Sequence, residues 1–173
     1  MLEKIRNHEL CHSNLRLEKI NTDNYYALAM LSVAPDQTEH LAPNWESMAS
    51  ALATQAEGRY AQVLGIFDGD TPVGFTLIGH NSFVFEVGPE VYRHSYDLWR
   101  FMIDQKYQGR GYGRDALKLI VDFIRTFPDG EEDVLATAYV EGNDVAKHLF
   151  LSSGFVPNGE TCKDEVVLVL PLK

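Results

Sequence analysis

The chain has 173 residues, of which 45% are hydrophobic and 23% are charged, and its formal net charge is −10. This length suits one domain, and the composition excludes a disordered chain, a collagen-like chain and a coiled-coil rod. The acidic balance argues against non-specific binding to nucleic acid or to an anionic membrane surface. It is compatible with a cationic partner, so we expect neither nucleic acid nor membrane among the partners.

Cysteine content and the start of the chain indicate the compartment. Cys11 and Cys162 are too few for a disulfide framework, and two free thiols are typical of a reducing cytosol. The start contains no apolar core of signal-peptide length, and no apolar run approaches the ~20 residues that span a bilayer. We therefore predict a cytoplasmic protein. No repeat or linker divides the chain, so residues 1–173 are expected to form a single domain.

Periodicity and turn residues predict alternating elements along the chain. We expect, in order, a strand at 15–20, helices at 25–32 and 44–54, hairpin strands at 61–67 and 73–79, a strand end or loop at 83–88, a strand at 96–103, a helix at 113–126, a strand at 134–140, a short helix starting near 143 and a strand at 165–170. This order predicts an α/β (α+β) domain with a mixed sheet.

A glycine-rich loop at residues 108–113, Gln-Gly-Arg-Gly-Tyr-Gly, is the sharpest chemical signal. Alternating glycines allow unusual backbone angles, so successive N–H groups can converge on one anion beside the positive end of the following helix. Lys106, Arg110 and Arg114 can add positive charge. The loop favours phosphate or pyrophosphate binding, although its spacing matches neither the P-loop nor the dinucleotide fingerprint. The alternative is a flexible turn with an exposed basic patch.

The loop resembles the Gln/Arg-x-x-Gly-x-Gly/Ala signature of the GNAT N-acetyltransferase superfamily. Residues 99–104 before it resemble the family's fourth strand, and residues 116–124 resemble its third helix. Residues 143–155, Asn-Asp-Val-Ala-Lys-His-Leu-Phe-Leu-Ser-Ser-Gly-Phe, look like the family's Asn…Ala…Leu-Tyr…Gly-Phe segment. The order and separation of the two motifs both fit. The resemblance implies a single-domain GNAT-like fold, with a central mixed, mostly antiparallel sheet flanked by helices.

The resemblance also implies an acetyl-CoA-dependent N-acetyltransferase. In the family, the fourth and fifth strands splay apart, and the pantetheine arm lies in the gap while loop amides hold the pyrophosphate. The cofactor-binding residues implied are Met102, Ile103, Gln108, Gly109, Arg110, Gly111, Tyr112, Gly113, Arg114 and Asn143. The reaction would be direct attack of a neutral amine on the thioester carbonyl. It requires that a proton leave the ammonium form and that the oxyanion be stabilised.

Phe150 departs from the family pattern, because a tyrosine at this position often serves as the general acid. Three interpretations stay open. The thiolate leaves unassisted, since a thiol pKa of about 8.5 makes it a tolerable leaving group; another tyrosine such as Tyr139 substitutes; or catalysis is weak or lost. The general base is equally open. Glu86 is the first candidate, and the alternatives are Glu90, Asp97, His94 or a water chain.

Residues 35–47 resemble the region between the first two helices of bacterial spermine/spermidine acetyltransferases, through Asp-Gln followed by Asn-x-x-Ser. This implies a small cationic amine as substrate, a polyamine or diamine such as spermidine or spermine, and the net charge agrees in sign. Candidate lining residues are Glu39, Glu46, Glu86, Glu90, Trp45 and Trp99, with solvated surface and core packing as the alternatives. The rival functions are a non-catalytic acyl-CoA binding or sensing module and acetylation of a protein amine or an aminoglycoside.

Two further features of the sequence concern oligomeric state and metal binding. Many members of the resembled family are dimers, and the terminal strand 165–170 is the candidate for pairing across a homodimer interface. Residues 8–12, His-Glu-Leu-Cys-His, formally match the His-Glu-x-x-His zinc motif. That motif works on a long helix with a third ligand downstream, whereas these residues precede a predicted strand, so we predict no metal.

Overall fold

The computed structural model of the chain describes residues 11–38, 41–81 and 88–173. The helices are α1 (Tyr25–Ala29), α2 (Asn44–Ala56), α3 (Tyr112–Ile124) and α4 (Asp144–Ser152), with 3₁₀ turns η2 (Pro35–Gln37) and η3 (Glu90–Arg93). The strands are β1 (Leu15–Lys19), β2 (Tyr60–Asp68), β3 (Thr71–His80), β4 (Tyr96–Ile103), β5 (Val134–Val140), β6 (Val156–Cys162) and β7 (Glu165–Pro171). The expected strand end or loop at 83–88 falls almost wholly on residues 82–87, outside the described residues.

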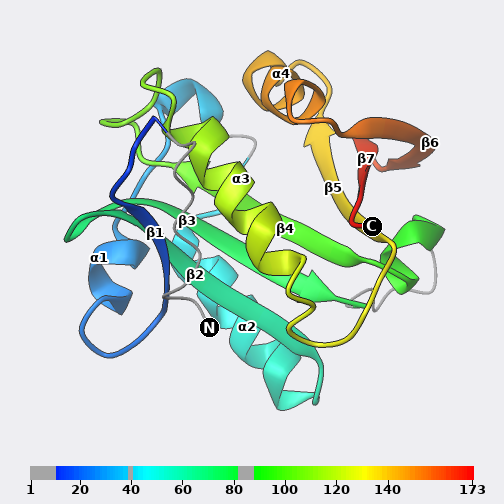
Figure 1. Ribbon diagram of the computed structural model, residues 1–173, viewed down its shortest axis with the longest axis horizontal. Coiled ribbons are helices and arrows are strands. Elements are labelled where there is room, and N and C mark those ends of the chain that lie inside the picture. The colour runs from blue at the N-terminus through cyan, green and yellow to red at the C-terminus, as the bar shows by residue number, and fades with distance from the viewer. Residues whose placement is uncertain (1–10, 39–40, 82–87) are drawn as a thin grey trace.

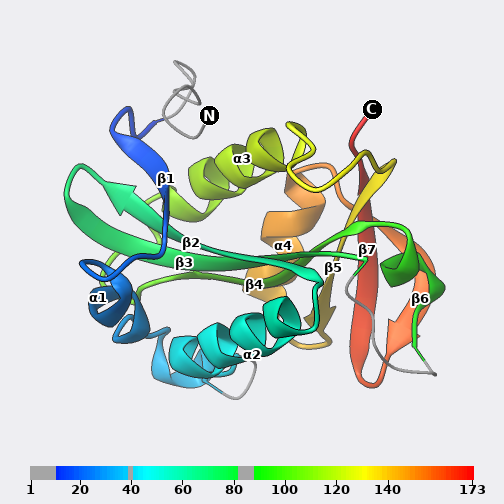
Figure 2. The same ribbon diagram turned by 90° about the horizontal axis from the view of Figure 1, so that it is seen from below.

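The strands form one seven-stranded sheet in the order β1-β2-β3-β4-β5-β7-β6. Neighbouring strands are antiparallel except β4 and β5, which are parallel. Helices α1 and α2 lie on one face of the sheet, and α3 and α4 lie on the other (Figures 1 and 2). This arrangement confirms the predicted α/β fold with a mixed, mostly antiparallel sheet flanked by helices.

Two buried apolar clusters hold these layers together. The α3-side cluster joins the buried face of α3 to Leu15, Leu98, Leu168 and Phe150. The α2-side cluster joins Ala51 of α2 and Leu28 of α1 to the other face of β2, β3 and β4. The helical spacing of Ala116, Leu117, Ile120, Phe123 and Ile124 predicted the buried face of α3, and all five are buried. Each large apolar side chain buried in this way stabilises the fold by about 1.5–3 kcal/mol.

Helix α1 is shorter than the predicted helix 25–32. The backbone leaves the helix after Met30, because the Ser32 N–H donates to Asp104 and the Ser32 carbonyl accepts from the Gln105 N–H. These long-range hydrogen bonds replace the helical ones that residues 31 and 32 would make. The end of α1 is therefore set by the segment that follows β4, which local sequence does not reveal.

Strand β6 was not predicted. Its Pro-Asn-Gly stretch at residues 157–159 is typical of a turn, and β6 pairs with β7 only near its two ends, with a register shift between Pro157 and Thr161. β7 therefore has β5 on one side and β6 on the other. This corrects the prediction that the terminal strand pairs across a homodimer interface, because β7 is not an edge of the sheet.

Two further findings concern the cysteines and the helices. Cys11 and Cys162 are both free thiols. Within the described ranges, no helix has the length and apolar character that crossing a membrane would require.

Candidate active site between strands β4 and β5

Strands β4 and β5 begin as neighbours and then separate. Their parallel ladder holds only the pairs Tyr96↔Leu135 and Asp97↔Ala136, although both strands continue for several residues. One residue further on, the Thr137 hydroxyl donates to the Leu98 carbonyl at 3.2 Å. The structure thus contains the splayed fourth and fifth strands that the family resemblance implied.

A β-bulge in β4 lies at the start of this split. Leu77 of β3 pairs with Arg100 and the next residue, Ile78, pairs with Leu98, so Trp99 is the extra residue. A bulge bends its strand and increases the local twist. It therefore turns the rest of β4 away from β5 and leaves the β5-facing edge of β4 without a neighbouring strand.

The glycine-rich loop connects the end of β4 to α3. Gly109 and Gly111 have φ values of +72° and +88°, which L side chains rarely adopt, and Gly111 is the N-cap of α3. Within the described residues, no side chain caps this helix, so the N–H groups of its first turn are available to an anion. Gly113 acts differently: it is already helical, and a Cβ there would lie 3.5 Å from Leu149 and 3.9 Å from Ile103. These are ordinary van der Waals distances, so α3, α4 and the end of β4 pack closely here without requiring a glycine.

Gln108 joins the loop to two other parts of the site. Its side-chain amide donates to the Ile103 carbonyl and to Oε1 of Gln37, both at 2.9 Å. The first bond closes the loop onto the last residue of β4. The second connects the loop to η2, which belongs to the Asp-Gln segment that the sequence linked to the amine substrate.

Asp104 makes a second connection between these segments. It is 4% exposed, and its carboxylate accepts the Ser32 N–H at 3.0 Å and the Lys106 N–H at 3.0 Å. The Gln105 N–H in turn donates to the Ser32 carbonyl at 2.8 Å. The segment between α1 and α2 is therefore bonded to the cofactor-loop segment at several points.

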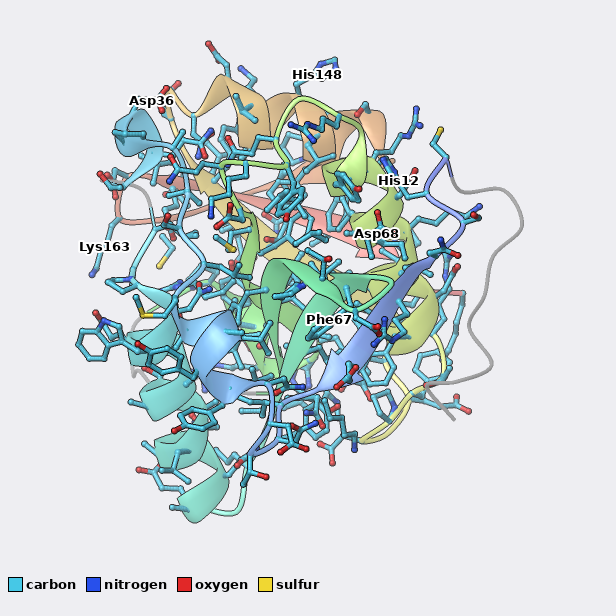
Figure 3. The ribbon with its side chains drawn as sticks, turned by 90° about the vertical axis from the view of Figure 1, so that its left-hand side faces the viewer. His12, Asp36, Phe67, Asp68, His148 and Lys163 are labelled. Atoms are coloured by element: carbon cyan, nitrogen blue, oxygen red, sulfur yellow. The ribbon has the colours of Figure 1, made fainter. Side chains whose placement is uncertain are left out.

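His12 and Asp115 support the loop from the other side. The His12 ring stacks on Tyr112 with centroids 3.8 Å apart, and Nδ1 donates to Asp115 at 2.8 Å. Burial favours a higher pKa for Asp115, but the hydrogen bonds from His12 outweigh burial and lower this pKa. The Tyr112 hydroxyl donates to Asp68 at 2.5 Å, and this bond raises the pKa of the phenol. His12 and Asp68 lie beside the start of α3 (Figure 3).

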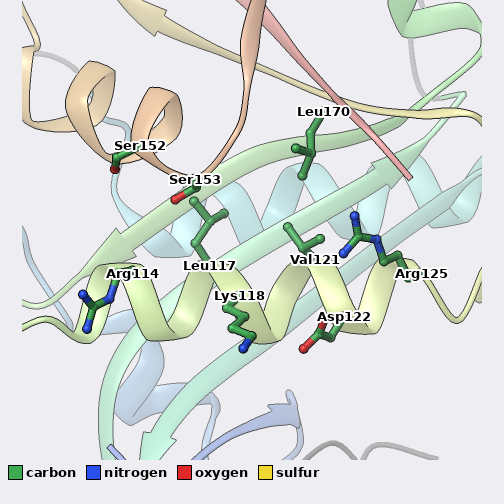
Figure 4. Close-up of a pocket in the computed structure, with 9 residues that line it drawn as sticks. All are labelled: Arg114, Leu117, Lys118, Val121, Asp122, Arg125, Ser152, Ser153 and Leu170. Carbon is green, nitrogen blue, oxygen red and sulfur yellow. The ribbon is translucent and has the colours of Figure 1, made fainter. Parts of the chain in front are cut away.

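The cations near the loop differ in their surroundings. Lys106 and Arg110 are exposed, while Arg114 donates to the Cys11 sulfur at 3.0 Å and lies 3.6 Å from Asp115. A groove along α3, lined also by the end of α4 and by Leu170, carries Lys118 and Arg125 (Figure 4). None of its lining residues comes from β4 or β5, so this groove is separate from the split.

The second motif forms α4 and its approach. The Asn143 side chain caps α4 by accepting the Ala146 N–H at 3.1 Å. Phe150 is buried against Phe155, with ring centroids 5.4 Å apart. Tyr139 of β5 is also buried, and both Tyr139 and Phe150 belong to the α3-side cluster. The candidate general acid and the phenylalanine that replaces the family tyrosine therefore lie on the same face of the sheet.

The opposite face of the split carries the residues expected near an amine. Trp99 packs against the α2-side cluster with Met102, whereas Trp45 is 61% exposed on α2. The buried Asn44 amide donates to the Leu28 carbonyl at 2.8 Å and contacts the Met102 sulfur at 3.8 Å. Core packing therefore accounts for Trp99 and Asn44, and Trp45 stays available at the surface.

Those predicted carboxylates that the structure describes are not gathered into one site. Glu39 and Glu86 lie outside the described residues, while Glu46, Glu90 and His94 are exposed. Asp97 is 1% exposed and accepts the Ser95 hydroxyl at 2.7 Å. Of the His-Glu-x-x-His residues the structure describes His12, whose Nδ1 is bonded to Asp115. Across the described parts of the chain, no group of three or more histidines, cysteines and carboxylates could hold a metal ion.

Several residues of this site carry no sequence signal of their role. Gln37, Asp104 and His12 meet their partners across 71, 72 and 103 residues respectively. All three belong to segments that the sequence singled out, but His12 was noted there only as part of a rejected zinc motif and Asp104 only as the end of a strand. These two are polar residues beside predicted strands, and only the fold brings them to the loop.

The sequence of the chain matches a known protein family and a known enzyme. The model of the acetyltransferase (GNAT) family matches residues 15–155. A spermine/spermidine N(1)-acetyltransferase from Bacillus subtilis (strain 168) is 27% identical over 149 residues, which cover 85% of this chain and 91% of that protein.

Solved structures of similar fold include other acetyltransferases. The spermidine N-acetyltransferase of Vibrio cholerae, in complex with CoA and spermine, has a TM-score of 0.67 at 14% identity, covering 92% of this chain and 96% of that one. An aminoglycoside N(6')acetyltransferase from Legionella pneumophila has a TM-score of 0.62 at 15% identity, covering 92% of each chain. The family match spans most of the chain and includes the split strands and the glycine-rich loop. The chain therefore belongs to the acetyltransferase (GNAT) family and is an acetyl-CoA-dependent N-acetyltransferase.

Proposed function

We propose that this protein acetylates a polyamine or diamine such as spermidine or spermine. The observation that carries the catalytic part is the split between β4 and β5, which ends at an uncapped helix N-terminus behind two left-handed glycines. The curated relative at 27% identity, named for spermine and spermidine, supports the choice of amine. The net charge of −10 agrees with a cationic substrate.

The residues of the split fit acetyl-CoA. A side chain at Gly109 would meet open space, so a diphosphate can reach the backbone there, and the first turn of α3 offers N–H groups. We assign the diphosphate to residues 108–114 and the pantetheine arm to the open edge of β4 at Met102 and Ile103, with Asn143 at the opposite wall. When bound, acetyl-CoA supplies an acetyl group activated as a thioester.

The chain's own groups divide between the two faces of the sheet. The cofactor loop, Tyr139 and Phe150 lie on the α3 side, and Trp99 and Asn44 lie on the α2 side. The amine would approach from the α2 side and attack the carbonyl directly. Tyr139 remains the proposed proton donor and Glu86 a proposed base. We also propose one domain over residues 1–173, a cytoplasmic location and a homodimer whose contact does not use β7 as an edge.

The test of this function is CoA release from acetyl-CoA by the purified protein across a panel of amines. The panel contains spermidine, spermine, short diamines, a lysine peptide and an aminoglycoside. We expect turnover with the polyamines or diamines, with kcat/KM at least about tenfold above the other amines, a difference of about 1.4 kcal/mol in transition-state binding. Preference for the peptide or the aminoglycoside would overturn the proposed substrate. Retention of acetyl-CoA without turnover of any amine would favour the sensing module.

Replacing Phe150 with tyrosine tests the missing phenol. We expect kcat with spermidine to change by less than about threefold, because Tyr139, the proposed proton donor, already protonates the departing sulfur. If the missing acid limited the reaction, the phenol would raise kcat toward the 10²–10⁴-fold typical of general acid catalysis. The companion variant Tyr139→Phe distinguishes a proton donated by Tyr139 from a thiolate that leaves unassisted. It lowers kcat only if Tyr139 donates the proton. Thermal unfolding of both variants controls for packing of the buried rings.

A further inference from the structure

Glu165, the first residue of β7, lies one strand beyond the split, next to the end of β5, on the face opposite to the cofactor loop. It pairs with Val140 of β5 and with Cys162 of β6. Its neighbour Val166 packs against the α3-side cluster. Successive residues of a strand point to opposite faces, so Glu165 points to the α2 side. This is the face from which the amine would approach.

Arg100 lies across the split from Glu165. The strand order β4-β5-β7 places the opening between the two residues, and the charge of Arg100 acts on the Glu165 carboxyl. Nη1 of Arg100 donates to the Trp99 carbonyl at 2.9 Å, and Nε is buried with no hydrogen-bond partner among the described residues. A cation and a carboxylate thus flank the opening near the β4 bulge.

The turn η3 covers this corner of the α2 side. Both carboxylate oxygens of Glu160 in β6 accept backbone N–H groups of η3, from Glu90 at 2.6 Å and Val91 at 3.4 Å. Tyr92 of the same turn is close enough to Glu165 to be affected by its charge. Burial is the main cause that raises the pKa of Tyr92, and Asp97 and Glu165 raise it further. The phenol facing Glu165 is therefore neutral near pH 7.

The surroundings of Glu165 raise the pKa of its carboxyl group. Burial raises the pKa of Glu165 and Asp164 adds to the rise, while Arg100 and Lys163 oppose it, and the balance lies above the ordinary value. These groups come from β4 and from the turn between β6 and β7, and Tyr92 comes from η3. Because its pKa is raised, the Glu165 carboxylate is a stronger proton acceptor than an exposed glutamate.

We propose that Glu165 accepts the proton that the acceptor amine loses before it attacks the acetyl thioester. One N–C bond forms and one C–S bond breaks. The ammonium nitrogen loses one proton to the Glu165 carboxylate before it attacks and a second proton after the N–C bond has formed. The second proton replaces the one that Tyr139, the proposed proton donor, gives to the sulfur, so CoA leaves as the thiol. The inference rests on the proposed function, because it takes a protonated primary amine as the acceptor. The proposal assigns the base to a partly buried carboxylate, whereas Glu90 and His94 are exposed.

The variant Glu165→Gln keeps the size of the side chain and removes the proton acceptor. We expect kcat/KM for spermidine at pH 7 to fall by about 10²-fold or more. In the wild type, protonation of Glu165 lowers the activity at acidic pH, and this decline should be absent from the variant. An alkyl amine has a pKa near that of lysine, about 10.4, so its neutral fraction rises roughly a hundredfold between pH 7 and pH 9. The variant should therefore approach the wild-type rate as the pH rises. The affinity for acetyl-CoA, measured by calorimetry, should not change.

Two further variants make the comparison specific. Asp164→Asn removes a neighbouring exposed carboxylate that raises the pKa of Glu165, so it should move the acidic limb of the pH profile to lower pH without the large loss of kcat/KM expected for Glu165→Gln. Glu86→Gln tests the base expected from the sequence. A Glu165→Gln enzyme whose pH profile runs parallel to the wild type, or whose only change is a higher KM for the amine, would overturn the proposal, as would a loss confined to Glu86→Gln. The variants are compared with the amine from the panel that the wild-type enzyme acetylates. If the wild-type enzyme does not acetylate spermidine, the proposed substrate is contradicted, but the role of Glu165 is still tested with the other amine.

Discussion

Replacing Gly111 with valine is expected to weaken acetyl-CoA binding by at least about tenfold, or about 1.4 kcal/mol. Gly111 caps α3 with a φ of +88°, where a β-branched residue is strained. A Cβ there would lie 3.6 Å from Cε1 of His12, so the branches of valine would crowd the ring that stacks on Tyr112. Both effects displace the N–H groups proposed to hold the diphosphate. Calorimetric titration of acetyl-CoA measures the loss.

The matched control is Gly58→Val. Gly58 has a φ of +75°, and a Cβ there meets nothing within 4 Å, so valine imposes similar backbone strain in the turn after α2. We expect both variants to lose stability, and only Gly111→Val to lose acetyl-CoA affinity. Wild-type affinity in Gly111→Val would contradict the assignment of the loop to the diphosphate.

Asp104→Ala is expected to reduce both stability and cofactor affinity. The buried carboxylate satisfies the N–H groups of Ser32 and Lys106, and alanine would leave both without a partner. Hydrogen bonds to a charged group contribute about 1.5–3 kcal/mol each, and water can replace part of both because the two N–H groups are only partly buried, so the free energy of unfolding should fall by about 2–4 kcal/mol. The segment between α1 and α2 would also lose a connection to the cofactor loop, and we expect about tenfold weaker acetyl-CoA binding.

Urea unfolding and calorimetry measure the two effects of Asp104→Ala separately. The variant Asp104→Asn keeps one acceptor oxygen and should fall between wild type and alanine in both measurements. An alanine variant that is destabilised but binds acetyl-CoA as tightly as the wild type would show that this contact supports the fold without positioning the loop.

The local patterns of the chain predicted most of the fold. The spacing of apolar residues predicted the buried face of α3. A turn between two apolar segments predicted β2 and β3, and strand propensity and apolar composition predicted β4 and β5, all within one or two residues of their ends. β6 was missed because its proline, asparagine and glycine are typical of a turn, and its pairing depends on β7. The early end of α1 was missed because tertiary hydrogen bonds at Ser32 compete with helical ones.

The candidate site was predictable only where its chemistry is local. The glycine loop and the Asn143 segment carry their signals in consecutive residues. Asp115 shows the limit: it lies next to the predicted buried face of α3, and only contact with His12 explains why a carboxylate is 3% exposed there. Glu165 appeared in the sequence as the start of a strand, and its place one strand beyond the split follows from strand order alone.

The most direct test of the central claim is a crystal structure of the wild-type protein grown with CoA and spermidine. We expect the diphosphate on the amides of residues 108–114, the pantetheine arm between β4 and β5, and the amine on the α2 side of the split. The thiol should lie near the β4 bulge, with a spermidine nitrogen facing Glu165. CoA bound in the groove along α3 beside Lys118 and Arg125, with the split empty, would contradict the account.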